Sequence, residues 1–191
     1  MEIESLAIPE VKLVTPRRFA DERGFFCESY NAARFAEAGL GYSFVQDNHS
    51  LSRARHTVRG LHYQAPPFAQ TKLVRPARGR ILDVAVDVRV GSPTYGRHVS
   101  AVLSAEDATF ILVPVGFLHG FLTLEPDTEV VYKVDAYYSK PQDGGVFFAD
   151  PDLGIDWGIA EGAAVLSAKD AGLPRFAEFV SPFVYREGAH A

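Results

Sequence analysis

The sequence predicts an all-β protein built as a sandwich or a barrel. Residues 80–90 carry the strongest pattern, in which apolar side chains alternate with more polar ones, as on a strand with one buried face. Further short strand patterns are separated by turns that contain Gly or Pro, which is typical of sandwiches and barrels. Helical patterns are scarce, so a helix-rich architecture is not expected.

The strand patterns cover most of the chain. After residues 80–90, a turn at 91–96 leads into a continued alternation at Val99, Ala101 and Leu103. A strand is also expected around Lys72. The remaining strands are expected at residues 11–14, 24–30, 44–51, 57–64, 110–115, 120–124, 129–134 and 146–148.

Two short helices are expected outside the strands. Asn31 is a good N-cap for residues 32–38, and Gly39 can end that helix. Ser167 begins a pattern that resembles a capping box, with Asp170 in the place usually taken by Glu. We expect one domain over residues 1–191, with a barrel core at about 44–150 and with N-terminal strands and C-terminal loops and helices packed on it.

The composition narrows the classes of protein to which this chain is expected to belong. The formal net charge is −5, whereas a nucleic-acid binder usually carries a basic surplus. The single cysteine, Cys27, cannot form an intrachain disulfide, which suits a reducing cytoplasm. The acidic start of the chain lacks the apolar run of a secretory signal. No stretch approaches the roughly 20 apolar residues that span a bilayer, so we expect no membrane segment.

Four expected strands each carry a polar group that could face a shared cavity, namely His62, Lys72, His119 and Tyr132. A single histidine on a strand is more often structural, but four such groups together favour a catalytic site. Arg59 lies three residues before His62, so on a regular strand the two point to opposite faces. Both can serve one cavity only if the chain bulges between them, where a glycine at position 60 permits it.

Other chemistries are less well supported by the sequence. Metal-binding barrels often pair two histidines two residues apart, but His62 is followed by Tyr63 and Gln64, so we expect no metal site. No serine lies in a nucleophile elbow, and no glycine-rich phosphate loop is present.

The order of the motifs resembles the dTDP-4-dehydrorhamnose 3,5-epimerase family over about residues 8–174. Each block is weak by itself, but all of them in order are specific. The blocks are residues 21–26 (DERGFF), 46–50 (QDNHS), 59–64 (RGLHYQ), 116–121 (GFLHGF), 132–133 (YK), 150–157 (DPDLGIDW) and 166–170 (LSAKD).

The resemblance implies a double-stranded β-helix, a cupin-like jelly-roll barrel, with a few short peripheral helices. It implies no metal and no organic cofactor, and usually a homodimer. The implied substrate is a thymidine-diphosphate sugar, dTDP-4-dehydro-6-deoxy-D-glucose. The implied reaction inverts C3 and C5 to give dTDP-4-dehydro-L-rhamnose, in the synthesis of dTDP-L-rhamnose.

The resemblance also implies a role for each site residue. His62 is the general base and pairs with Asp170, Tyr132 is the proton donor on the other face of the sugar, and Lys72 stabilises the enolate oxygen. The remaining positions are substrate contacts. Arg23 and Arg59 contact the diphosphate, Glu28, Gln46 and Asn48 contact the nucleotide, Tyr138 stacks on thymine, and His119, Lys169 and Asp143 bind further parts of the substrate. Asp143 departs from the family pattern, which usually has Glu there.

These residue types suit the chemistry. Inverting a carbon beside a ketone requires a proton to leave one face and return on the other, so an acid must oppose a base. Histidine, with an ordinary pKa near 6.5, suits the base, and tyrosine, near 10, keeps its proton at neutral pH. Three alternatives remain open. The first is a relative that inverts only one carbon, C3 or C5, of a related nucleotide-4-ketosugar, or that acts on a different nucleotide. The others are a metal-dependent cupin enzyme and a non-catalytic carbohydrate-binding barrel.

Overall fold

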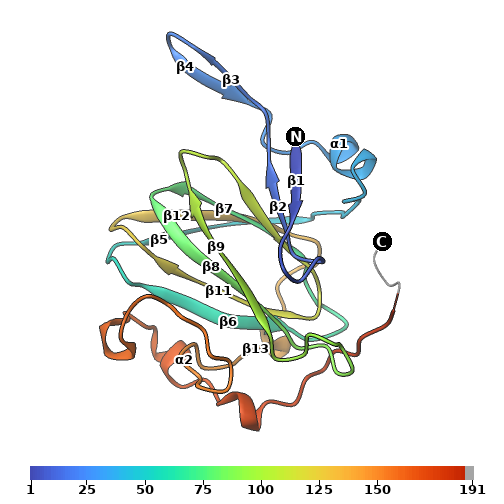
Figure 1. The fold of residues 1–191 in the computed structure, drawn as a ribbon, viewed down its shortest axis with the longest axis vertical. Coiled ribbons are helices and arrows are strands. Elements are labelled where there is room, and N and C mark those ends of the chain that lie inside the picture. The colour runs from blue at the N-terminus through green and yellow to red at the C-terminus, as the bar shows by residue number, and fades with distance from the viewer. Residues whose placement is uncertain (188–191) are drawn as a thin grey trace.

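Two antiparallel β-sheets face each other in the computed structural model, which describes residues 1–187 (Figure 1). The prediction of an all-β jelly-roll barrel is confirmed. The larger sheet has the order β1 (Glu2–Ser5), β2 (Lys12–Thr15), β10 (Phe110–Val113), β7 (Lys72–Arg78), β12 (Thr128–Val134) and β5 (Gln46–Ser52). The smaller sheet has the order β13 (Asp143–Gly145), β6 (Val58–Gln64), β11 (Phe117–Thr123), β8 (Arg80–Asp87) and β9 (His98–Ser104).

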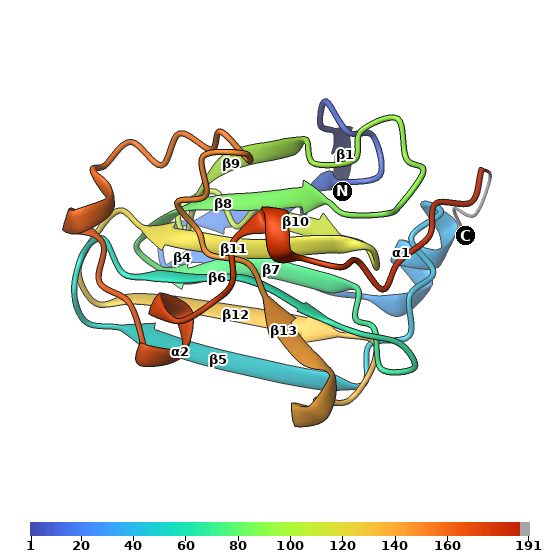
Figure 2. The ribbon, with the colours of Figure 1, turned by 90° about the horizontal axis from the view of Figure 1, so that it is seen from below.

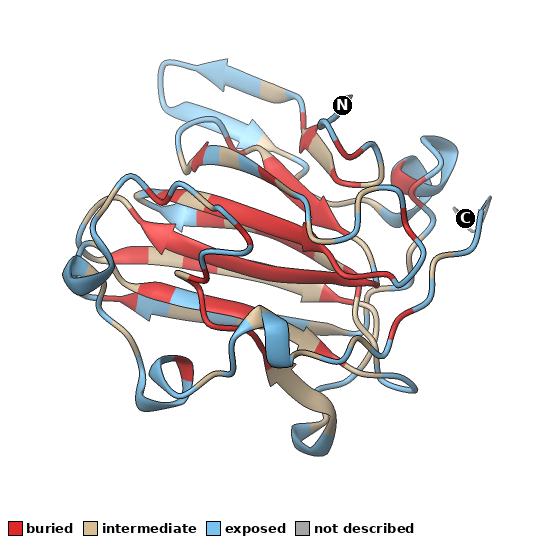
Figure 3. Ribbon diagram, turned by 60° about the horizontal axis from the view of Figure 1, so that its bottom comes forward, coloured by how far each residue is buried: buried red, intermediate tan, exposed pale blue. Residues whose placement is uncertain are grey.

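Apolar side chains fill only part of the space between the two sheets. Val74, Ile111 and Val130 of the larger sheet pack against Ala85 and Phe117 of the smaller one. This core lies beside the middle strands of both sheets (Figure 3). The remaining space, beside β5, β6, β11 and β12, is lined by polar side chains.

Strand β8 differs from the simple expectation of one buried and one polar face. Its apolar side chains, such as Val84 and Val86, pack on the outer side of the smaller sheet. Its polar side chains, Asp83 and Asp87, are fully buried on the inner side. Both faces are covered because the C-terminal segment packs over the outer face, and the buried carboxylates are tolerated because they are hydrogen-bonded.

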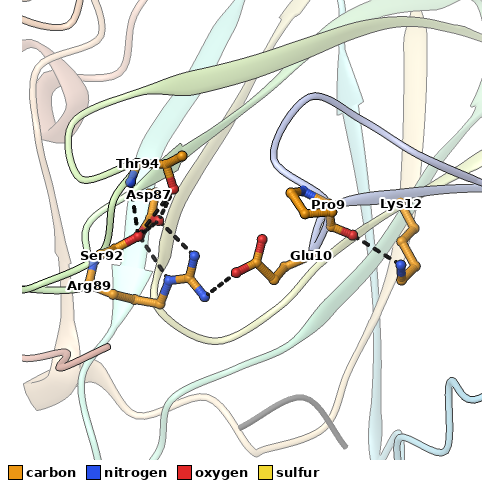
Figure 4. Close-up of polar contacts among 7 residues, drawn as sticks. All are labelled: Pro9, Glu10, Lys12, Asp87, Arg89, Ser92 and Thr94. Atoms are coloured by element: carbon orange, nitrogen blue, oxygen red, sulfur yellow. Dashed lines mark hydrogen bonds and ion pairs between the residues drawn. The ribbon is translucent and has the colours of Figure 1, made fainter. Parts of the chain in front are cut away.

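The buried carboxylate of Asp87 anchors a polar network at one end of β8 (Figure 4). The Arg89 guanidinium donates to Asp87 Oδ2 at 2.7 Å and pairs with Glu10 at 2.8 Å. Ser92 and Thr94 hydroxyls donate to the same Asp87 oxygen at 2.5 and 2.6 Å. Burial acts to raise the pKa of Asp87, but these hydrogen bonds outweigh it and hold the pKa below its ordinary value.

The C-terminal segment covers the outer face of the smaller sheet (Figure 2). Phe148, Leu153 and Trp157 are its buried anchors there. As predicted, this segment is made of loops and short helices, which include η2 (Glu161–Ala163), α2 (Ala168–Ala171) and η3 (Phe176–Glu178). The strand predicted at 146–148 is wrong, since β13 ends at Gly145 and residues 146–150 form a loop and a turn.

Helix α1 (Ala32–Glu37) lies on the other side of the barrel (Figure 1) and buries Phe35 against Leu73, on the outer face of the larger sheet. Asn31 caps it as predicted, because its side chain accepts a hydrogen bond from the Arg34 backbone N–H. A further short helix, η1 (Lys140–Gln142), precedes β13. No helix within residues 1–187 is long and apolar enough to cross a membrane.

A hairpin of β3 (Arg18–Asp21) and β4 (Gly24–Cys27) projects away from both sheets (Figure 1). Its strands pair only with each other among the described residues. Phe25 and Phe26 on this hairpin are 59% and 69% exposed. Large apolar side chains exposed together on a projecting element are typical of an interaction site.

Candidate active site

The polar space between the sheets forms two adjoining cavities of about 230 and 300 Å³. Their walls share His62, Lys72, Tyr132 and Lys169, so the two cavities form one continuous cleft. Every residue predicted for the site lines this cleft except Arg23 and Glu28; the residues present are Gln46, Asn48, Arg59, His62, Lys72, His119, Tyr132, Tyr138, Asp143, Lys169 and Asp170.

Strand β6 brings Arg59 and His62 to the same cleft because it bulges between them. His62 pairs with His119 of β11, but Arg59 pairs with Phe121, so three steps on β6 oppose two on β11. The bulge depends on Gly60, which has φ +132°, and a Cβ there would lie 2.5 Å from the Gly120 Cα. Only glycine fits this conformation and this close approach, as the sequence predicted.

His62 is held by a carboxylate from the C-terminal segment. Its Nε2 lies 2.5 Å from Asp170 Oδ1, and Asp170 is only 5% exposed. Burial acts to raise the pKa of Asp170, but the hydrogen bonds from His62 and Ser167 outweigh it and lower the pKa. An ionised carboxylate only accepts hydrogen bonds, so Nε2 carries the proton and Nδ1 is left as the proton acceptor.

Lys72 enters the cleft from β7, in the larger sheet. Burial lowers the pKa of Lys72 to about 8, although the negative charges of Asp143 and Asp83 oppose the shift. Within residues 1–187, no carboxylate lies within 4.0 Å of the Lys72 ammonium. A cation without an immediate counter-ion is well suited to stabilise negative charge that develops on a bound molecule.

Tyr132 faces His62 from the opposite sheet, since Tyr132 belongs to β12 of the larger sheet and His62 to β6 of the smaller one. Burial raises the pKa of Tyr132, while the charge of Arg59 partly opposes the shift. The phenol therefore keeps its proton at neutral pH. A base and an acid thus face one cleft from opposite walls.

A second histidine–carboxylate pair lies beside the first. His119 Nε2 contacts both oxygens of Asp83, at 2.9 and 3.0 Å, and Asp83 is fully buried. Asp83 was not predicted as a site residue. Its place among the polar positions of the strand at residues 80–90 could have indicated it. Ser50 also lines the cleft and was not predicted there. The sequence could have indicated it, because Ser50 follows Gln46 and Asn48 at every second position of one strand.

One end of the cleft carries a connected set of polar side chains. The Gln46 amide donates to Asn48 Oδ1 at 2.8 Å and accepts from the Tyr138 backbone N–H at 3.0 Å. Asp143 Oδ2 accepts from the Tyr138 hydroxyl at 3.0 Å and from the Lys169 ammonium at 2.5 Å. The hydrogen bond to Asp143 raises the pKa of Tyr138. The shorter acid at position 143 thus contacts both neighbours.

Arg23 and Glu28 lie outside the cleft of their own chain. Arg23, on the β3–β4 turn, is 86% exposed and pairs with Asp21 at 2.6 Å. Glu28 follows β4 and pairs with Arg34 at 3.1 Å. Sequence spacing cannot reveal this separation, because it depends on the direction in which the hairpin projects. Among residues 1–187, no three His, Cys, Asp or Glu side chains form a group that could hold a metal ion.

Comparisons with known proteins give consistent matches over most of the chain. The family model of dTDP-4-dehydrorhamnose 3,5-epimerase matches residues 5–178. A relative with that name from Sinorhizobium fredii is 51% identical over 185 residues, which cover 97% of this chain and 94% of the relative. Another from Escherichia coli K12 is 44% identical over 172 residues, 89% of this chain and 91% of the relative.

Solved structures are similar over nearly the whole chain. The dTDP-6-deoxy-D-glucose-3,5-epimerase of Legionella pneumophila, in complex with dTDP-4-keto-L-rhamnose, has a TM-score of 0.91 at 40% identity, covering 97% of this chain and 98% of that one. A 3'-monoepimerase of Streptomyces bikiniensis, in complex with dTDP-quinovose, has a TM-score of 0.82 at 34% identity, covering 91% and 87%. The chain described here belongs to the dTDP-4-dehydrorhamnose 3,5-epimerase family.

Proposed function

We propose that the protein is an isomerase that converts dTDP-4-dehydro-6-deoxy-D-glucose to dTDP-4-dehydro-L-rhamnose by inverting C3 and C5, in dTDP-L-rhamnose biosynthesis. The observation that carries this proposal is that His62 and Tyr132 line one cleft from opposite sheets, and that Lys72 lines the same cleft. The names and ligands of the relatives support the substrate.

In this mechanism His62 removes the proton from the carbon beside the C4 ketone. Nδ1 is the accepting atom, because Nε2 is bound to Asp170. The carboxylate of Asp170 fixes the ring orientation and stabilises the imidazolium that forms. General-base catalysis of this kind contributes roughly 10²–10⁴-fold in rate.

Removal of that proton places negative charge on the C4 oxygen as an enolate. The Lys72 ammonium would stabilise this charge, and a cation about 4 Å from it contributes roughly 4 kcal/mol at an effective dielectric near 20. His119, whose Nε2 is held by Asp83, faces the same cavity. Tyr132 then donates a proton on the opposite face, which completes the inversion of one carbon. His62 releases its proton to solvent and Tyr132 takes one up before the second carbon reacts.

The polar end of the cleft would hold the nucleotide. Gln46, Asn48 and Tyr138 line that end, where an exposed aromatic ring offers a flat face to thymine. Arg59, His119, Lys169 and Asp143 would contact the diphosphate and the sugar. No step requires an organic cofactor, because proton transfer involves no change of oxidation state.

Inversion at a single carbon is the second candidate, because the Streptomyces bikiniensis relative is named a 3'-monoepimerase. Incubation with substrate in heavy water, followed by NMR, distinguishes the two. Deuterium at both C3 and C5 is expected, whereas deuterium at one carbon supports the second candidate. No deuterium at either carbon contradicts proton abstraction altogether.

We also propose a homodimer in which the β3–β4 hairpin of one subunit reaches the cleft of the other. The projection of the hairpin, its exposed Phe25 and Phe26, and the position of Arg23 outside its own cleft support this arrangement. Mixed dimers of Arg23→Ala and His62→Asn subunits test it. If Arg23 reaches the cleft of the other subunit, each mixed dimer keeps one complete site and is active. If Arg23 serves the cleft of its own subunit, no site is complete and the mixed dimer is inactive.

A cytoplasmic location completes the proposal. The one cysteine, Cys27, is a free thiol, as expected in a reducing compartment. Cell fractionation tests this location.

A further inference from the structure

Ser167 contacts Asp170 through a single hydroxyl group in two ways. Its Oγ accepts a hydrogen bond from the Asp170 backbone N–H at 3.0 Å, which caps α2. The same Oγ lies 2.9 Å from Asp170 Oδ2, to which it donates. The hydroxyl has one proton, so that proton is directed at the carboxylate rather than at the cleft, which Ser167 also lines.

Both oxygens of the Asp170 carboxylate therefore have a partner. Oδ2 accepts from Ser167, and Oδ1 contacts His62 Nε2 at 2.5 Å. The carboxylate is nearly fully buried, so it has few alternative partners if one of these is removed. Two contacts on different oxygens fix the rotation of the carboxylate plane, whereas one contact leaves it free to turn.

We propose that Ser167 is a positioning residue for the base: it holds Asp170 with Oδ1 toward His62, and so keeps His62 Nδ1 aimed into the cleft. This inference rests on the proposed function, in which His62 removes a proton. In this role Ser167 acts through Asp170, with which it makes both of its hydrogen bonds described above. A serine that served α2 only as a cap would act on the whole helix, independently of the orientation of the Asp170 carboxylate.

The test compares Ser167→Ala with Ser167→Thr, which keeps the hydroxyl and can still cap α2. Ser167→Ala is expected to lower kcat about tenfold with KM changed less than twofold, because the loss falls on the base rather than on substrate binding. Ser167→Thr is expected to recover most of kcat. If Ser167→Ala folds poorly, Ser167→Gly replaces it in the test, because glycine removes the hydroxyl but is a tolerated N-cap. Ser167→Gly should then show the same loss of kcat.

A double-variant cycle separates positioning from capping. If Ser167 acts through Asp170, Ser167→Ala costs nothing further in an Asp170→Ala background, since the side chain that it holds is already gone. If Ser167 serves only as a cap, the two losses multiply. Multiplying losses, or a kcat of Ser167→Ala within twofold of the wild type, would overturn the proposal.

An NMR readout does not depend on turnover. The proton on His62 Nε2 should give a hydrogen-bonded resonance in the wild type and in Ser167→Thr, and should broaden or shift upfield in Ser167→Ala. An unchanged resonance in Ser167→Ala would count against positioning. Wild-type protein that fails to exchange deuterium into the substrate would instead contradict the proposed function, so the two failures are distinguishable.

Discussion

Replacement of Lys72 with methionine should make the protein more stable and much less active. Burial lowers the pKa of Lys72 from 10.5 to about 8. A change of this size corresponds to roughly 3 kcal/mol of cost to the folded state at pH 7, where the ammonium is charged. Methionine has a similar length and no charge, so it removes this cost. For a chain of this size, removing the whole cost would raise the Tm by roughly 6–12 °C, which is the largest increase expected for Lys72→Met.

The contribution of Lys72 to the free energy of unfolding depends on pH. The folded state holds Lys72 at a depressed pKa of about 8, so between pH 8 and 10.5 it binds fewer protons than the unfolded state. The contribution of this group to stability therefore rises with pH across that window. The stability difference between Lys72→Met and the wild type should shrink over the same range and be largest below pH 8.

Activity should change in the opposite direction. Loss of roughly 4 kcal/mol of enolate stabilisation corresponds to about a thousandfold lower kcat/KM. In the wild type, kcat/KM should fall above about pH 8 as Lys72 loses its proton. This basic limb should be absent from the residual activity of Lys72→Met.

Chemical denaturation at pH 7 and at pH 10, together with pH profiles of kcat/KM, measures both effects. Lys140→Met is the matched control, because Lys140 is an exposed lysine, and its stability should change by less than about 0.5 kcal/mol. A Lys72→Met protein that is less stable than the wild type at pH 7 would refute the reasoning about burial. Activity within tenfold of the wild type would refute the role in enolate stabilisation.

Three further predictions concern other parts of the cleft. His62→Asn should abolish turnover while dTDP still binds in calorimetry, and near-normal turnover would mean that another group is the base. Tyr132→Phe should keep solvent deuterium exchange while net inversion falls, so an equal loss of both would exclude a dedicated acid. Gly60→Ala should lower the free energy of unfolding by at least about 2 kcal/mol, because of its φ of +132° and the 2.5 Å approach to Gly120. Gly91→Ala, which also has positive φ but meets no neighbour within 4 Å, is the control, and equal effects of the two would show that the close approach is unimportant.

The class of fold and most of the candidate site residues could be predicted from the amino-acid sequence. Alternation of apolar and polar residues is a local property of a strand, so β8 is recognisable without tertiary information, and β10 is recognisable as a short apolar run. The caps at Asn31 and Ser167 are equally local, because each depends on a side chain and a backbone N–H three residues away. The ordered motifs indicated which polar residues belong together.

The way in which these residues meet depends on long-range packing, which the sequence pattern does not specify. The contact of His62 with Asp170 joins positions 108 residues apart, and no local pattern specifies such a distance. The burial of Asp83 depends on the neighbouring strands β9 and β11 and on a second sheet that closes the space. The position of Arg23 outside the cleft follows from the direction of the β3–β4 hairpin. Side-chain periodicity fixes which face a residue occupies, but long-range packing fixes what that face meets.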